Sequence, residues 1–152
     1  KQIISTGTCG VLVDMPENVF FIPTRALRDE GASYHYVAPS RYIDMNEKAL
    51  VAIEKTLKQK KIPYEEVMTW STDGFYRETS DKISYRIEEG CSVVEMECAA
   101  LAAVAQFRGA IWGLLLFTAD SLADIENYNQ RDWGSEAFDK ALELCLDIIV
   151  QM

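Results

Sequence analysis

The segment that most constrains the fold is Ile111–Phe117, an uninterrupted run of apolar residues. A run this short and this continuous is typical of a strand that is buried on both faces of a sheet. It is about a third of the ~20 residues that a membrane-spanning helix needs, so we expect no membrane span. Val19–Ile22 is a second run of the same kind. The chain is therefore expected to fold around a sheet whose two faces are both covered.

Strand patterns alternate with helix patterns along the chain. Strands are expected at Gln2–Thr6, Val19–Ile22, Tyr64–Ser71, Ser92–Glu95 and Ile111–Phe117. Helices are expected at Asn46–Lys61, Ser80–Glu89, Glu97–Phe107 and Gly134–Gln151. This alternation predicts an α/β protein of three layers, with a mainly parallel or mixed central sheet and helices on both faces. A length of 152 residues fits a single domain over residues 1–152.

Three connecting segments contain residues that favour turns. Gly7–Gly10 has two glycines and is expected to form a turn where backbone can approach a ligand closely. Pro23 is expected to end the second strand. Arg25–Tyr42 contains Gly31 and Pro39 and is expected to be mostly loop.

Charge and cysteine content narrow the classes of partner. The net charge of −9 argues against a nucleic-acid groove, because phosphate backbones are held mainly by Lys and Arg. Four cysteines without a CxxC pair indicate reduced thiols in a cytoplasmic protein. The single histidine, His35, has no second ligand at a useful spacing, so no metal site is expected.

Polar residues that follow the predicted strands are the candidates for a site, because ligands of such sheets bind where strands end. Glu95 and Glu97 flank Met96 between an apolar strand and an Ala-rich helix. In extended chain, residues two apart share a face, so both carboxylates could point to one site. The alternative is that one carboxylate caps the helix and the other is solvated.

Three further candidates have ordinary structural alternatives. Asp120 ends the most apolar strand, where it is either a general acid or an N-cap. Phe75 lies in a loop, where its ring either stacks on a base or packs in the core. The hydroxyl and backbone amides of Thr8, Cys9 and Gly10 could cradle an anion, although this pattern alone is weak.

Taken together and in this order, these motifs resemble the nucleoside phosphorylase superfamily, which includes purine nucleoside phosphorylase, uridine phosphorylase and methylthioadenosine nucleosidase. The most specific match is Val94-Glu95-Met96-Glu97 with the alanines that follow it. The Gly7–Gly10 and Ser71–Tyr76 segments and Asp120 fall at fitting intervals, and Asp29–Tyr36 looks more like the uridine phosphorylase branch. The resemblance spans nearly all of the chain but only about the carboxyl-terminal two thirds of a family domain. We therefore expect a domain that is incomplete at its N-terminus.

The resemblance implies the roles of individual residues. Substrate binding is expected from Thr8, Cys9, Gly10, Phe75, Val94, Glu95, Met96 and Glu97. Glu97 would hold the ribose hydroxyls, Met96 would pack beneath the sugar, and Phe75 would stack on the base. Thr8 would contact phosphate, and Asp120 would protonate a purine at N7 as it leaves. Asp120 and Glu97 are thus the expected catalytic residues.

The implied reaction is cleavage of a purine or pyrimidine nucleoside by phosphate, giving free base and ribose 1-phosphate. Inorganic phosphate is the co-substrate, no further cofactor is expected, and the family suggests a homo-oligomer. Family phosphorylases usually carry an arginine where this chain has Ser5, three positions before Thr8. Two alternatives therefore stay open: a nucleoside hydrolase, and a truncated, inactive nucleoside-binding module.

Overall fold

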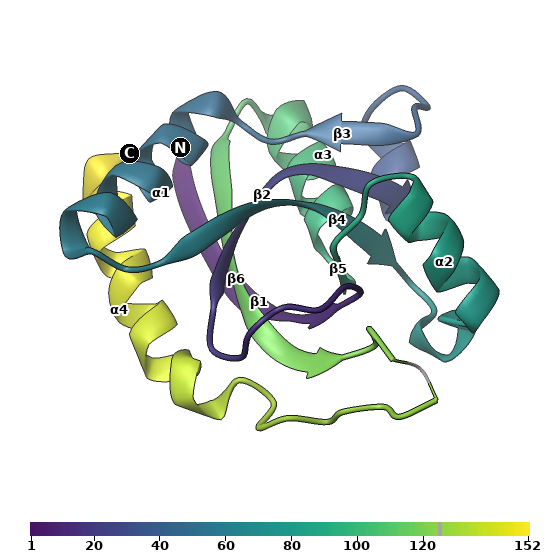
Figure 1. The fold of residues 1–152 in the computed structure, drawn as a ribbon. Coiled ribbons are helices and arrows are strands. Elements are labelled where there is room, and N and C mark those ends of the chain that lie inside the picture. Colours follow the sequence, from purple (N-terminus) through teal and green to yellow (C-terminus); the bar gives the residue numbers. More distant parts are fainter. Residues whose placement is uncertain (125) are drawn as a thin grey trace.

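The computed structural model describes residues 1–124 and 126–152 (Figure 1). Its strands are β1 (Gln2–Val11), β2 (Phe20–Asp29), β3 (Tyr42–Asp44), β4 (Tyr64–Thr72), β5 (Val93–Glu95) and β6 (Ile111–Ser121). Its α-helices are α1 (Glu47–Lys60), α2 (Ser80–Glu88), α3 (Cys98–Arg108) and α4 (Ser135–Gln151). Two 3-10 turns, η1 (Ala32–His35) and η2 (Phe75–Arg77), complete the described elements.

The strands form one mixed, strongly curved sheet. Their order is β3-β2-β4-β5-β1-β6, and β6 pairs again with β2, so the sheet closes on itself like a small barrel (Figure 1). The pairs β1–β6, β2–β4 and β4–β5 are parallel, whereas β1–β5, β2–β3 and β2–β6 are antiparallel. The sheet is therefore mixed, which confirms the expected fold class.

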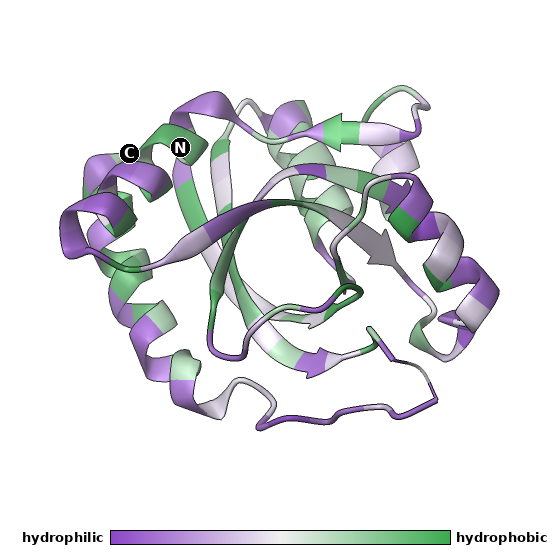
Figure 2. Ribbon diagram, in the orientation of Figure 1, coloured by the Kyte–Doolittle hydropathy of each residue, from purple (hydrophilic) through white to green (hydrophobic). Residues whose placement is uncertain are grey.

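Alternate residues of the central strands face different helices. Phe20 and Ile22 of β2 pack in a cluster with α1 and α4, whereas Phe21 packs with the alanines of α3 on the other face. A third cluster forms beneath α2, around Trp70 and Ile83. Figure 2 shows that α1, α2 and α4 have mixed hydrophobic and hydrophilic faces. This two-sided burial explains the continuously apolar runs Val19–Ile22 and Ile111–Phe117.

The helix boundaries follow from local chemistry. Asn46 caps α1, because its side-chain oxygen accepts from the backbone amides of Lys48 and Ala49 at 3.1 and 3.3 Å. Lys61 and Gly109 end α1 and α3 in the left-handed conformation. None of the described helices is both long enough and apolar enough to span a bilayer.

Two local expectations are wrong, and each error has a physical reason. Gly7–Gly10 is not a turn: β1 runs through it and pairs with Leu116–Thr118 of β6. Pro23 does not end β2, because a shift in the pairing with β4 between Pro23 and Arg25 absorbs the imino acid. As a result β2 continues to Asp29 and occupies the first residues of the predicted loop.

Gly134, which precedes α4, offers a test of the packing beneath β6. Its φ is +73°, and a Cβ there would lie 2.6 Å from the Phe117 ring and 2.9 Å from the Thr118 carbonyl oxygen. We expect Gly134→Ala to lower the free energy of unfolding by about 2–4 kcal/mol, because strain and a backbone clash add together. Chemical denaturation measures the change.

The matched control is Gly109→Ala. Gly109 also has a positive φ, +61°, but nothing lies within 4 Å of a Cβ built there. This variant isolates the conformational cost, which we expect to be about 1 kcal/mol. Equal losses in the two variants would contradict a packing role for Gly134.

Candidate active site

One cavity collects the residues singled out in the sequence. It has a volume of about 520 Å³ and lies where β1, β5 and β6 end, between η2 and the segment 126–134. The predicted residues that line it are Thr8, Cys9, Gly10, Phe75, Val94, Glu95, Met96, Glu97 and Asp120. A second hollow of about 530 Å³, between β3, α1 and α3, contains none of them.

Glu95 forms the buried base of the cavity and is 6% exposed. One carboxylate oxygen accepts from the hydroxyls of Ser71 at 2.5 Å and Thr69 at 3.1 Å, both on β4. The other accepts from the backbone amides of Glu97 at 2.7 Å and Cys98 at 2.6 Å. Burial raises the pKa of the Glu95 carboxyl, and these hydrogen bonds oppose the rise by favouring the charged form. Glu95 thus ties β5 to β4 and to the start of α3.

Glu97 and Met96 present their side chains differently from Glu95. Both are exposed, Met96 to 40%, and Glu97 stands at the N-cap of α3 without a side-chain cap hydrogen bond. Both residues line the same cavity, but not as successive positions of one strand face, because the strand ends at Glu95 and the chain turns into the helix. Within the described residues no donor reaches the Glu97 carboxylate, so it is free to accept hydrogen bonds from a ligand.

Asp120 is held near the end of β6 by groups from two other segments. Its Oδ2 accepts a hydrogen bond from the Tyr128 hydroxyl at 2.8 Å. A Cβ on Gly10 would lie 2.9 Å from Asp120 Oδ1 and 2.7 Å from Leu122, so only glycine lets β1 pass this close to the carboxyl group. The absence of a side chain at position 10 therefore leaves room for the Asp120 carboxyl where it lies.

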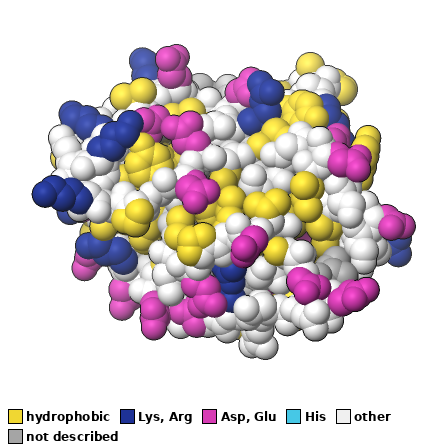
Figure 3. All heavy atoms as spheres, in the orientation of Figure 1, with side chains coloured by type: hydrophobic (Ala, Val, Ile, Leu, Met, Phe, Trp, Pro, Cys, Tyr) yellow, Lys and Arg dark blue, Asp and Glu magenta, His cyan; other side chains and the backbone are white. Residues whose placement is uncertain are grey.

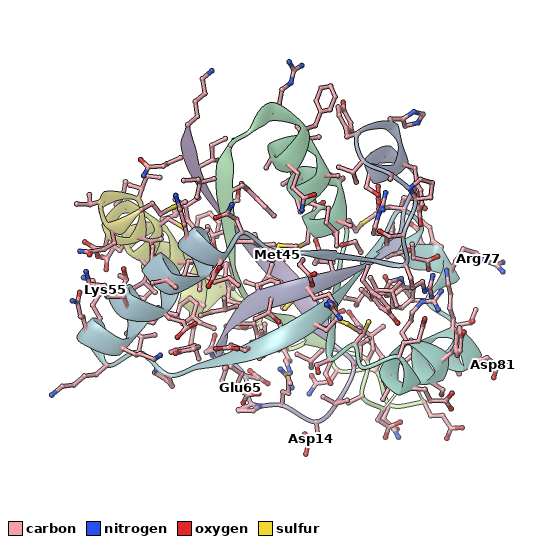
Figure 4. All side chains as sticks on the ribbon, turned by 90° about the horizontal axis from the view of Figure 1, so that it is seen from above. Asp14, Met45, Lys55, Glu65, Arg77 and Asp81 are labelled. Atoms are coloured by element: carbon pink, nitrogen blue, oxygen red, sulfur yellow. The ribbon has the colours of Figure 1, made fainter. Side chains whose placement is uncertain are left out.

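The aromatic wall comes from η2. Phe75 is 52% exposed, and its ring centroid lies 3.9 Å from that of Tyr76. An exposed ring on a cavity wall can stack on a flat ligand, and this exposure is unlike that of a core residue. Arg77, two residues further, points away from the molecule in Figure 4 and is not part of the lining.

β1 contributes backbone and one hydroxyl. Thr8 is exposed toward the cavity, whereas Cys9 is 3% exposed and its thiol donates to the Phe117 carbonyl at 3.6 Å. Burial raises the pKa of the Cys9 thiol well above its usual value, with the charges of Glu95 and Asp120 acting in the same direction. Cys9 is therefore no nucleophile here and offers the cavity its backbone.

Sequence reasoning did not place three further functional groups in the site: Glu78, Tyr128 and Trp133. Glu78 follows η2 directly, and burial together with the charge of Asp120 raises its pKa to about 7. Tyr128 and Trp133 come from the segment after β6, where no local pattern marks them. Ala119 and Leu122 also line the cavity.

The cavity is lined by negative charge only. Its charged groups in the described residues are the carboxyls of Glu78, Glu95, Glu97 and Asp120, without lysine or arginine. Among the described residues no group of three His, Cys, Asp or Glu is arranged to hold a metal ion. In the view of Figure 3, basic side chains gather at the left, and acidic ones are frequent along the lower edge. The acidic lining of the cavity suits a neutral ligand with several hydroxyls, or a ligand on which positive charge develops.

The fold and the cavity define a mixed α/β protein with an acidic cavity at the strand ends. The family model of the phosphorylase superfamily matches residues 1–150, so the chain belongs to the phosphorylase superfamily. This confirms the resemblance noted in the sequence. No curated protein matches the sequence significantly.

Solved structures with the same fold have several activities in their names. AMP nucleosidase from Bacteroides thetaiotaomicron superposes with a TM-score of 0.80 and 22% identity, over 99% of this chain and 60% of that one. Uridine phosphorylase from Vibrio fischeri superposes with a TM-score of 0.82 and 21% identity, over 98% of this chain and 63% of that one. A futalosine hydrolase mutant from Helicobacter pylori superposes with a TM-score of 0.81 and 17% identity, over 98% of this chain and 68% of that one. The chain thus spans about 60% of the length of the first of these structures.

The hydrogen bonds of Glu95 predict a stability role that Glu97 does not share. Glu95→Gln removes the charge that four donors converge on, and we expect the free energy of unfolding to fall by about 2 kcal/mol. The same change at exposed Glu97 is expected to cost less than about 0.5 kcal/mol. Urea denaturation of the two variants measures the difference, and similar losses would contradict the structural role of Glu95.

Proposed function

We propose that this chain carries the sugar- and base-binding part of an enzyme that cleaves the N-glycosidic bond of a purine or pyrimidine nucleoside. One observation carries the proposal: a single cavity holds an open carboxylate at a helix N-terminus, an exposed aromatic ring and an aspartate at a strand end. Membership of the phosphorylase superfamily, which the family match shows, supports the same reaction class.

The sugar end of the proposed site is formed by Glu97 and Met96. The free Glu97 carboxylate accepts hydrogen bonds from two ribose hydroxyls, and Met96 packs against the sugar ring. Cleavage of the bond passes through an oxocarbenium-like state in which C1′ and the ring oxygen become positive. An all-acidic lining stabilises that charge more than it stabilises the neutral nucleoside, which lowers the barrier.

The base end is formed by Phe75 and Asp120. Phe75 stacks on the heterocycle and fixes its plane. Asp120 hydrogen-bonds to the ring nitrogen that takes up a proton as a purine leaves. The Tyr128 hydroxyl, 2.8 Å from Asp120 Oδ2, orients the carboxyl group toward the ligand. A purine nucleoside, a pyrimidine nucleoside or both fit this description.

Phosphate is the proposed nucleophile, with ribose 1-phosphate as the product. The Thr8 hydroxyl and the neighbouring backbone of β1 supply donors for it. Water is the second candidate, because the lining described here contains no cation and would repel a divalent anion. At Ser5, where an arginine would help, the side-chain oxygen accepts from the Trp112 indole at 3.0 Å.

The phosphate dependence of base release distinguishes the two nucleophiles. We expect purine and pyrimidine nucleosides to release free base in the presence of phosphate, with ribose 1-phosphate formed in equal amount. High-performance liquid chromatography of a nucleoside panel, with and without phosphate, measures both products. Equal rates without phosphate would indicate a hydrolase, and tight nucleoside binding without any turnover would indicate an inactive binding module.

Glu97→Gln tests the sugar contact. We expect kcat/KM to fall by about 30- to 1000-fold, equivalent to roughly 2–4 kcal/mol, because a charge-assisted contact to the transition state is lost. Steady-state kinetics measures the loss, and an unchanged unfolding curve shows that the variant is folded. Activity within about twofold of the parent would contradict the ribose role.

Two broader expectations belong to the same proposal. The rings of Tyr36 and Phe107 are exposed and pack edge to face, with their centroids 5.7 Å apart. They offer an apolar surface to a second copy of the chain, which supports assembly into a homo-oligomer. The described cysteines are all free thiols, which supports a reducing compartment such as the cytoplasm.

A further inference from the structure

Glu78 lines the cavity with a carboxyl group to which the proposed reaction assigns no role. It follows η2 directly, and its backbone amide donates to the Phe75 carbonyl at 3.1 Å. One 3-10 turn therefore ties its position to that of the stacking ring. Its side chain is partly buried, lines the same cavity as Asp120, and forms no hydrogen bond or ion pair with the described residues. An unpartnered carboxyl group in such a place has its hydrogen-bonding capacity available for a ligand.

Charged and titratable groups from several elements surround Glu78. Asp120 of β6 disfavours its charged form, whereas Lys82 of α2 favours it. Tyr128, which donates to Asp120, completes this end of the cavity, and burial combines with the Asp120 charge to raise the pKa of Glu78 to about 7. The remaining cavity carboxyls, Glu95 and Glu97, lie at the junction of β5 and α3. Near neutral pH, Glu78 is thus divided between a neutral and a charged form.

We propose that Glu78 is a second catalytic carboxyl of this site: in its neutral form it holds, beside Asp120, the proton that passes to the departing base. The inference rests on the proposed N-glycosidic cleavage. Asp120 alone would have to be both the acceptor of the Tyr128 hydroxyl and the donor to the base. A second carboxyl separates these roles, as in other sites where two neighbouring carboxyls are held in different protonation states.

The proton balance of the step is complete within the named groups. The bond between C1′ and the base nitrogen breaks, and its electron pair goes to the base. The Glu78 proton moves to a ring nitrogen or carbonyl oxygen of that base, directly or through Asp120. The oxygen of phosphate or water bonds to C1′, and the proton that this nucleophile gives up restores the Glu78 carboxyl. The substrate class is therefore a nucleoside whose base leaves as a neutral, newly protonated heterocycle.

The position of Glu78 also favours it over its neighbours in this role. Arg77 points out of the molecule in Figure 4, and Thr79 does not line the cavity. Lys82 is absent from the lining as well. Among the described residues from η2 to α2, Phe75 and Glu78 reach the cavity, one with an apolar face and the other with a transferable proton.

The pH dependence of the reaction tests this role with Glu78→Gln. Neutral Glu78 is the donor, so kcat/KM of the parent is expected to fall about tenfold per unit as the pH rises above about 7. Glutamine keeps the shape and can donate a hydrogen bond, but it cannot transfer a proton. At pH 6 the variant should therefore lose about 100-fold in kcat/KM, and its profile should be flat from pH 6 to 8.

The control is Glu88→Gln, the same change at an exposed position of α2 outside the cavity, which should keep the parental profile. A Glu78→Gln variant with the parental pH profile would overturn the role of Glu78 and leave the proposed reaction intact. A parent chain that releases no base at any pH would overturn the proposed reaction itself. The two failures are thus distinguishable.

A second measurement does not depend on turnover. Carbon-13 NMR of the glutamate carboxyls, with the Glu78 signal assigned by its loss in Glu78→Gln, gives the titration midpoint directly. We expect a midpoint near 7 in the parent and a lower one in Asp120→Asn, because a neighbouring negative charge is removed. A midpoint near the ordinary value of 4.5, or one that Asp120→Asn does not move, would overturn the proposal.

Discussion

The carboxylate of Glu95 is the interaction on which the arrangement of the site depends. Its four donors come from β4 and from the first backbone amides at the start of α3, while Glu95 itself ends β5. A buried charge is tolerated only when it is this well solvated by fixed donors. By satisfying amides that a helix N-terminus leaves open, Glu95 determines where the chain turns, and thereby where Met96 and Glu97 stand.

The charge of the cavity has opposite consequences for the two proposed ligands, the nucleoside and phosphate. A group of carboxyls attracts a sugar that is becoming positive and repels a phosphate that is already negative. For the proposed reaction, this lining favours the positive charge that develops as the glycosidic bond breaks and disfavours a bound anion. The structures that share the fold are named after both phosphorylases and hydrolases, so fold alone does not choose between the nucleophiles.

The sequence predicted those parts of the fold that are governed by local chemistry. The expected helix Asn46–Lys61 agrees with α1 because the residues that cap its two ends, Asn46 and Lys61, are adjacent to it in the sequence. The course of β1 through Gly7–Gly10 and of β2 through Pro23 could not be read in the same way, because pairing with β6 and β4 decides it. For the candidate site, the resemblance brought together residues from four distant segments. Glu78 and Tyr128 were not predicted as site residues, since their proximity to Asp120 depends on tertiary packing.

Gly10 has a consequence for how such a site can diversify. The backbone of Gly10 lies directly against the Asp120 and Leu122 side chains, and a Cβ there would be 2.9 Å and 2.7 Å from them. Evolution cannot widen or narrow that wall by exchanging a side chain without displacing the aspartate. Changes of ligand preference are therefore expected elsewhere in the lining, in the turn that bears Phe75 and in the segment that bears Tyr128 and Trp133. The wall formed by Gly10 tolerates no side chain without a shift of Asp120, whereas the other walls tolerate substitution.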